Sequence, residues 1–202
     1  MDFKLYNDWL PMELFKFGEG MFLIAYVVQR QKEHKEKVKE GPIKTYFLKN
    51  IDDYTKYKYE MIKLADTFGA RIYITVSPKS IKKFQDRLAL RIAKFNVENN
   101  LVNPAKIVNS VAGELPPENP MWIIDLDDVK QEDAVKKLLN KLYSQAHKKF
   151  DYELHKFYFT VETLNGKHII AKPFNLKAFQ EVFPDIDIHK NSMGTLLYVP
   201  KM

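Results

Sequence analysis

Two aspartates directly after an apolar run have the residue types and the spacing for metal-dependent chemistry. Trp122, Ile123 and Ile124 predict a buried strand, and Asp125 and Asp127 stand at its end. Because side chains alternate along a strand, both carboxylates leave one face. Neighbouring carboxylates repel each other and resist desolvation, and a divalent cation is the usual compensation. The pattern therefore predicts a divalent-metal site or, more simply, a strand end where an aspartate caps the next helix.

Two later segments carry residues that can complete such a site. The hairpin segment ETLNGKHII contains His168, and the segment PDIDIHK contains Asp187, His189 and Lys190. Phosphoryl transfer with two metal ions needs several carboxylates around ions about 3.5–4 Å apart, and a nearby histidine or lysine can bind phosphates. Taken singly, His168 can be an ordinary strand histidine, Asp187 a strand-end acid and Lys190 a surface lysine.

The second half of the chain has the pattern that can position these residues. It predicts a strand ending at Asp127, a helix over 131–149, strands over 154–163 and 167–173 joined by a turn at Asn165-Gly166, and a short helix after Asn175. The segments IDIHK and TLLYVP predict two final strands. We therefore expect an α+β protein whose residues 119–202 form a split βαβ, RRM-like sheet with helices on one face.

The first half predicts an α/β lobe over residues 1–118. Apolar runs at 21–31 and 43–48 suggest a hairpin whose charged connector, KEHKEKVKEG, is a solvated loop or a phosphate-contacting arm. A helix capped by Asp52 or Asp53 should end at Gly69, and a strand should follow over 70–76. Residues 103–120 are the expected boundary between the lobes, and residues 1–20 show no clean period.

A second helix of this lobe is expected to begin at Ser77-Pro78 and to carry basic residues along one face. The default interpretation is a solvated surface, and the alternative is contact with nucleic acid. The candidates for that contact are Lys79, Lys83, Arg87 and Arg91. A net charge of +6 and an isoelectric point near 9.2 favour polyanionic partners without identifying one.

Composition narrows the classes of protein. Hydrophobic residues make up 46% of the chain, which is typical of a folded protein. The absence of cysteine excludes disulfides, thiolate zinc sites and a cysteine nucleophile. The longest apolar run, residues 21–28, is short for a membrane helix, and the N-terminus lacks the layout of a signal peptide. We expect a soluble, cytoplasmic protein with no membrane partner.

Three segments, in order, resemble the motifs of the archaeo-eukaryotic primase and primase-polymerase family. WIIDLDD is similar to its hydrophobic-Asp-x-Asp motif, TLNGKHII to its turn followed by a histidine, and IDIHKNSMGTLLYVP to its hydrophobic-Asp motif with a basic residue, a glycine turn and a strand. RIYITVSPKS resembles the strand and basic stretch that precede the first motif. The family often has Ser or Thr and more than one glycine before the histidine, whereas here Gly166 and Lys167 precede it.

The resemblance implies that residues 1–202 form one catalytic domain, a template-dependent nucleotidyltransferase. It implies Mg²⁺ or Mn²⁺ on Asp125, Asp127 and Asp187, and nucleoside triphosphate phosphates on His168 and Lys190. Without cysteine, no zinc is expected. The resemblance also implies a single-stranded nucleic-acid template in a basic groove between the lobes, and replication proteins as partners. Two alternatives stay open: a non-catalytic nucleic-acid-binding replication accessory protein, and a metal-dependent nuclease or phosphohydrolase using the same acids.

Overall fold

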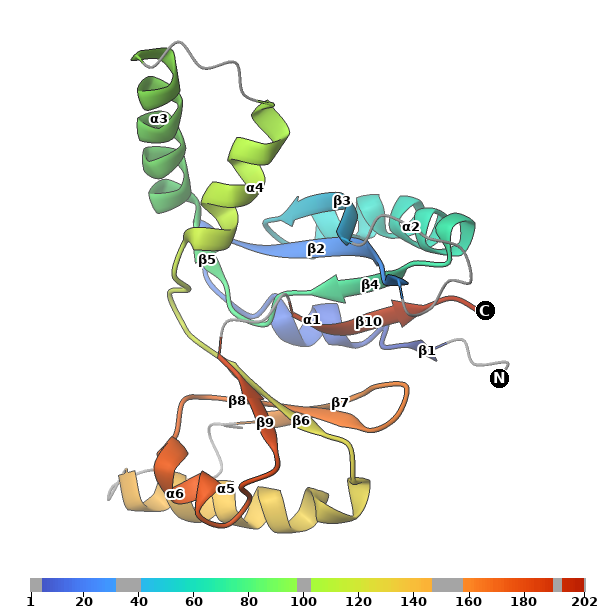
Figure 1. The fold of residues 1–202 in the computed structure, drawn as a ribbon, viewed down its shortest axis with the longest axis vertical. Helices are drawn as coiled ribbons and strands as arrows, with labels where there is room; N and C mark the ends of the chain where they lie inside the picture. The colour runs from blue at the N-terminus through green and yellow to red at the C-terminus, as the bar shows by residue number, and fades with distance from the viewer. Residues whose placement is uncertain (1–4, 32–40, 98–102, 147–157, 191–193, 202) are drawn as a thin grey trace.

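Two antiparallel sheets, each with its own helices, form two lobes that meet along one side (Figure 1). The computed structural model describes residues 5–31, 41–97, 103–146, 158–190 and 194–201. The expected two-lobed α+β fold is confirmed. Among the described residues, no helix has the length and the apolar character needed to cross a membrane.

The first sheet has the strand order β1-β10-β4-β2-β3, and a short β5 also pairs with β2. Its strands are β1 (Leu5–Tyr6), β2 (Met21–Gln29), β3 (Gly41–Leu48), β4 (Arg71–Ile74), β5 (Lys79–Ser80) and β10 (Thr195–Val199). The expected hairpin of β2 and β3 is confirmed by their antiparallel register. Nine of the ten residues of its charged connector, 32–40, lie outside the described residues.

Helices α1 (Leu10–Leu14) and α2 (Ile51–Phe68) cover one face of the first sheet and share a core with it. The cap of α2 is Asn50 rather than Asp52 or Asp53, because the Asn50 side chain accepts the hydrogen bond from the Asp53 N–H at 2.9 Å. The helix ends at Gly69, as expected, in the left-handed conformation with φ of 55°.

A helical hairpin, α3 (Ile81–Val97) and α4 (Pro104–Glu114), projects from the other face of this sheet (Figure 1). The expected helix start at Ser77-Pro78 is wrong, because Lys79 and Ser80 form β5 against Met21 and Phe22. The expected boundary passage over 103–120 is mostly helical. The Asn103 side chain caps α4 and Pro104 occupies its first turn, a sequence signal for a helix start.

The second sheet has the strand order β7-β8-β6-β9 and every pair is antiparallel. Its strands are β6 (Trp122–Leu126), β7 (Tyr158–Glu162), β8 (Lys167–Ala171) and β9 (Asp187–His189). A 3₁₀ turn (Val129–Gln131), α5 (Glu132–Ala146) and α6 (Leu176–Gln180) complete this lobe. With α5 after β6 and α6 after β8, this order is the expected split βαβ arrangement with both helices on one face.

The last strand departs from the expected fold. Residues of TLLYVP were expected beside β9 in the second sheet, but β10 lies between β1 and β4 in the first. The physical reason is burial: all five residues of β10 are buried, as in an interior strand covered on both faces, whereas β9 is short and largely exposed. The chain therefore crosses back from the second sheet to the first just after the candidate site.

Candidate active site between the sheets

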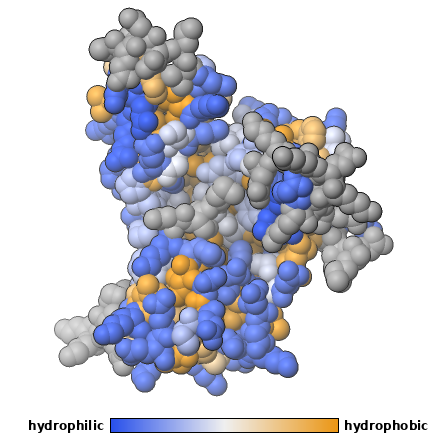
Figure 2. All heavy atoms as spheres, viewed as in Figure 1, coloured by the Kyte–Doolittle hydropathy of each residue, from blue (hydrophilic) through white to orange (hydrophobic). Residues whose placement is uncertain are grey.

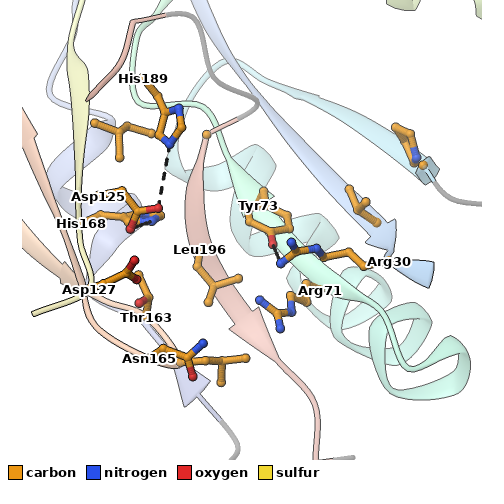
Figure 3. Close-up of a pocket in the computed structure, with 16 residues that line it drawn as sticks. Arg30, Arg71, Tyr73, Asp125, Asp127, Thr163, Asn165, His168, His189 and Leu196 are labelled. Atoms are coloured by element: carbon orange, nitrogen blue, oxygen red, sulfur yellow. Dashed lines mark hydrogen bonds and ion pairs between the residues drawn. The ribbon is translucent and has the colours of Figure 1, made fainter. Parts of the chain in front are cut away.

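A cleft of about 500 Å³ lies between the two sheets, and both sheets supply polar side chains to it (Figure 3). Asp125, Asp127 and His168 come from the second sheet. Arg30, Arg71 and Tyr73 face them from the first sheet. The cleft therefore has an acidic and imidazole wall opposite an arginine and tyrosine wall.

The acidic wall follows from the alternation of side chains along β6. Ile124 and Leu126 pack into the core beneath the sheet with α5, while Asp125 points to the cleft on the opposite face. Asp125 is paired directly with His168 on β8 and with Asp187 on β9. Directly paired residues of neighbouring strands share a face, so these three sequence-predicted residues lie side by side.

Two imidazoles flank the Asp125 carboxylate. His168 Nε2 lies 3.5 Å from its Oδ1, and His189 Nε2 lies 3.9 Å from its Oδ2 (Figure 3). The hydrogen bond with His168 lowers the pKa of Asp125 below its ordinary value, against the opposing effect of burial, and the charges of both histidines lower it further. Asp125 is thus held as a carboxylate at neutral pH, ready to bind a cation.

The remaining two predicted acids border Asp125 from exposed positions. Asp127 and Asp187, with Asp125, line a smaller hollow of about 200 Å³ at the end of β6. Carboxylate oxygens are the donors that Mg²⁺ and Mn²⁺ prefer, so the donor set and its shared face fit a divalent ion. As placed, no three acidic or histidine side chains among the described residues are close enough to hold a metal ion, so the exposed Asp127 and Asp187 would have to rotate toward Asp125.

The arginine wall was not recognised from the sequence as part of a site. Arg71 and Tyr73 alternate along β4 with the core residues Ile72 and Ile74, so both point to the cleft. Arg30 follows β2, and its guanidinium donates to the Tyr73 hydroxyl at 3.5 Å. The alternation in RIYI was the available signal. A strand with arginine and tyrosine on one face and isoleucines on the other turns its polar side chains away from the core, where they can line a cleft.

Lys190, expected to bind nucleotide phosphates, lies outside this cleft. Its ammonium stands over the Trp122 ring, 5.0 Å from the ring centroid, and it lines a second hollow of about 340 Å³ on the other side of His189. A cation at that distance is held by the negative face of the indole. Lys190 is therefore next to the site rather than in it.

The four basic residues predicted to contact nucleic acid are engaged within the first lobe. Lys79 donates to the carbonyls of Ala112 (2.6 Å) and Leu115 (2.8 Å) at the end of α4, and burial lowers its pKa. This lysine is a helix cap rather than an open contact. Lys83 pairs with Glu118 at 2.8 Å, and both arginines are bound to Glu114, Arg87 at its carbonyl and Arg91 at its carboxylate.

The helical hairpin therefore presents less free positive charge than its sequence suggests. Figure 2 shows its surface as mostly hydrophilic, interrupted by apolar residues. Leu90 and Ile92 of α3 are exposed. The expected continuous basic surface is thus divided by internal ion pairs and by apolar side chains.

The turn between β7 and β8 places His168, and it differs by one residue from the expected Asn165-Gly166 turn. The Thr163 N–H donates to the Gly166 carbonyl at 3.0 Å, and the Gly166 N–H donates to Thr163 Oγ1 at 3.1 Å. Leu164 and Asn165 are therefore at the tip. Gly166 is required for another reason, because a Cβ there would lie 2.2 Å from the carbonyl oxygen of Leu126 on β6.

Glu132 anchors this hairpin to α5 from the side opposite the cleft. Its carboxylate accepts hydrogen bonds from Lys136 and from Thr160 (3.3 Å), and it lies 2.8 Å from Lys167 Nζ. Hydrogen bonds from Lys136 and Lys167 lower the pKa of Glu132 to about 2, from an ordinary 4.5. Lys167, which precedes His168, is thereby directed away from the cleft.

We expect Glu132→Gln to destabilise the fold by about 1–2 kcal/mol at pH 7, because Lys136 loses its carboxylate partner and Lys167 is left with Glu162 alone. The folded-state pKa is depressed, so this contribution is fully present above about pH 4.5 and is lost as the pH falls toward 2. Urea unfolding of both proteins between pH 7 and pH 3 measures the difference. A destabilisation that does not shrink as the pH falls would contradict the assignment.

Comparisons of this chain with protein-family models, with curated proteins and with solved structures find no match.

Proposed function

We propose that this protein is a template-dependent nucleotidyltransferase that uses nucleoside triphosphates and Mg²⁺ or Mn²⁺. The observation that carries the proposal is the cross-strand group of Asp125, His168 and Asp187, of which Asp125 and His168 face two arginines across one cleft. A carboxylate cluster opposite a cationic wall is the arrangement that binds a metal-complexed polyphosphate. The ordered resemblance to primase motifs supports the same chemistry.

Each wall has a distinct role in this proposal. Asp125, Asp127 and Asp187 would hold the divalent ion or ions, which neutralise charge on the reacting phosphate and on the attacking oxygen. His168, Arg30 and Arg71 bind and orient the phosphate chain. The bond that forms joins a 3′-hydroxyl oxygen to the α-phosphorus, and pyrophosphate leaves. Positioning and charge neutralisation supply the acceleration, with no covalent enzyme intermediate.

The polyanion partner is single-stranded nucleic acid, attracted by the net charge of +6. We expect the end of the nucleic-acid strand to lie in the cleft. The α3 surface is a weaker candidate than the sequence suggested, because Glu114 and Glu118 already neutralise part of it. Lys190 lies beside Trp122 on the far side of His189 and is a candidate for a contact with the nucleic acid. Replication proteins are the protein partners that we expect for such an enzyme.

The direct test is incorporation of labelled nucleotides on single-stranded templates with magnesium or manganese. The proposal expects extension that depends on both template and metal. A protein that binds nucleic acid but is inert under every metal and template would instead be a non-catalytic accessory protein. Shortening of the template without incorporation would identify a nuclease or phosphohydrolase.

We expect Arg30→Ala with Arg71→Ala to raise the apparent KM for nucleotide at least tenfold. Each arginine removed deletes charge-assisted hydrogen bonds, worth about 1.5–3 kcal/mol apiece. Arg87→Ala with Arg91→Ala is the matched control, since it removes the same charge from outside the cleft. Equal effects of the two pairs on KM would show that net charge, and not the arginine wall, binds the nucleotide.

A further inference from the structure

One side-chain hydrogen bond joins the two sheets at the site itself. Thr195 Oγ1, on β10 of the first sheet, lies 2.8 Å from Nδ1 of His168, on β8 of the second. Thr195 is fully buried, and the His168 side chain is only 14% exposed. The ring of His168 is therefore held at both nitrogens, by Thr195 at Nδ1 and beside Asp125 at Nε2.

The backbone fixes the position of the Thr195 hydroxyl. Gly194 has φ of +122°, and a Cβ there would lie 2.1 Å from the carbonyl oxygen of Ile74. Only glycine lets the chain enter the first sheet this close to β4. Thr195 then pairs with Ile74 in the β10–β4 register, so the backbone that carries its hydroxyl cannot be displaced without moving a central strand.

The sheets do not depend on this hydroxyl for their attachment. Asn7 Nδ2 donates to the carbonyl of Glu162 on β7 and to that of Leu196 on β10, both at 2.9 Å, and so ties the same two sheets through their backbones. Loss of the Thr195 hydroxyl is thus expected to act on the His168 ring and to leave the joint between the lobes in place.

We propose that Thr195 is a positioning residue that fixes the orientation and the tautomer of His168. A neutral imidazole carries one N–H, and the bond at one nitrogen decides where the proton sits. The Thr195 hydroxyl can donate or accept, but the Asp125 carboxylate beside Nε2 can only accept, so together they place the ring proton on Nε2, toward Asp125, with the Thr195 hydroxyl donating to Nδ1. This tautomer presents an N–H donor to an anionic phosphate oxygen. The phosphate role rests on the proposed function, whereas the tautomer assignment does not.

The first test needs neither ligand nor activity. Long-range ¹H–¹⁵N spectra of protein labelled on histidine, taken where the rings are neutral, distinguish a protonated from an unprotonated ring nitrogen. His168→Gln identifies the signals. In the parent protein we expect His168 to carry its proton on Nε2, and Thr195→Val to mix the tautomers.

Two controls distinguish the effect of losing the Thr195 hydroxyl from a general disturbance of strand β10. Thr195→Ser keeps the hydroxyl and should restore the parental spectrum. Thr75→Val removes another buried threonine hydroxyl of the first lobe, one that accepts from the Ile24 N–H, and should leave His168 unchanged. If Thr195→Val does not fold, Thr195→Ala carries the same expectation with a smaller side chain. A His168 spectrum that is unchanged in a folded Val or Ala variant overturns the inference.

The second test reads the consequence for the reaction. Loss of one neutral hydrogen bond behind a phosphate donor should raise the nucleotide KM about three- to tenfold in Thr195→Val, with kcat nearly unchanged and Thr195→Ser restoring KM. A fall in kcat alone would overturn the phosphate role. If the parent protein incorporates no nucleotide while the spectra respond as expected, the proposed function fails and the positioning role of Thr195 stands.

Discussion

Replacing Asp125 and Asp127 together by alanine should reduce nucleotide incorporation to the background of the assay. The variant removes two of the three proposed metal ligands, including the carboxylate that the neighbouring histidines hold in its ionised form. Binding of single-stranded nucleic acid should survive or tighten, because it depends on positive charge and two repelling carboxylates are gone. Incorporation and a fluorescence-anisotropy binding curve, measured on the same preparation, give both results.

The matched control for this variant is Asp128→Ala. Asp128 lies in the same loop, but its side chain accepts from the Lys130 N–H at 3.0 Å and caps the 3₁₀ turn. We expect it to cost about 1 kcal/mol of stability and to keep activity. Asp125→Asn with Asp127→Asn preserves shape and should be as inactive as the alanine pair. Full activity in either double variant, with unchanged thermal melts, would mean that the reaction occurs elsewhere.

The acidic half of the site could be predicted because its geometry is local. Alternation along β6 places Asp125 opposite Leu126, and this needs only the residue order. His168 and Asp187 were expected on the same surface because the split βαβ order brings β8 and β9 to either side of β6. The register that pairs both with Asp125 agrees with that expectation.

The other half of the site depends on long-range pairing that the residue order does not determine. TLLYV is apolar enough to predict a buried strand, but its composition does not tell which of two sheets receives it. With β10 assigned to the wrong sheet, the contact of Thr195 with His168 could not be anticipated. For the same reason the arginines of the first sheet were not connected with the aspartates of the second.

The basic helix shows a different limit of sequence patterns. Periodicity grouped Lys79 with the charged face of α3, but the residue belongs to β5, and its ammonium is desolvated at the end of α4. Glu114, which binds Arg91 at 2.5 Å, is 23 residues away in sequence. A pattern within one helix contains no information about acceptors that a second helix supplies.

Gly166→Ala is expected to damage both the fold and the site. The added methyl group would lie 2.2 Å from the Leu126 carbonyl oxygen and 3.0 Å from the Cα of Asp127, and both are backbone atoms that cannot turn aside. The β7–β8 turn must therefore move away from β6. We expect a loss of about 1–3 kcal/mol in the free energy of unfolding, as for other overpacked sites.

The same displacement should impair catalysis more than stability alone explains. Gly166 lies two residues before His168 and packs on the backbone that carries Asp127, so the methyl group separates the proposed phosphate contact from a proposed metal ligand. A misplacement of about 1 Å can cost about 100-fold in rate, and we expect a loss of that size in kcat/KM. Gly113→Ala is the matched control: it lies in α4 with open space around it and should stabilise by about 0.5–1 kcal/mol with activity kept. Activity and urea unfolding of both variants, measured well below their melting temperatures, test the argument, and a stable and fully active Gly166→Ala protein would refute the close contact between the turn and β6.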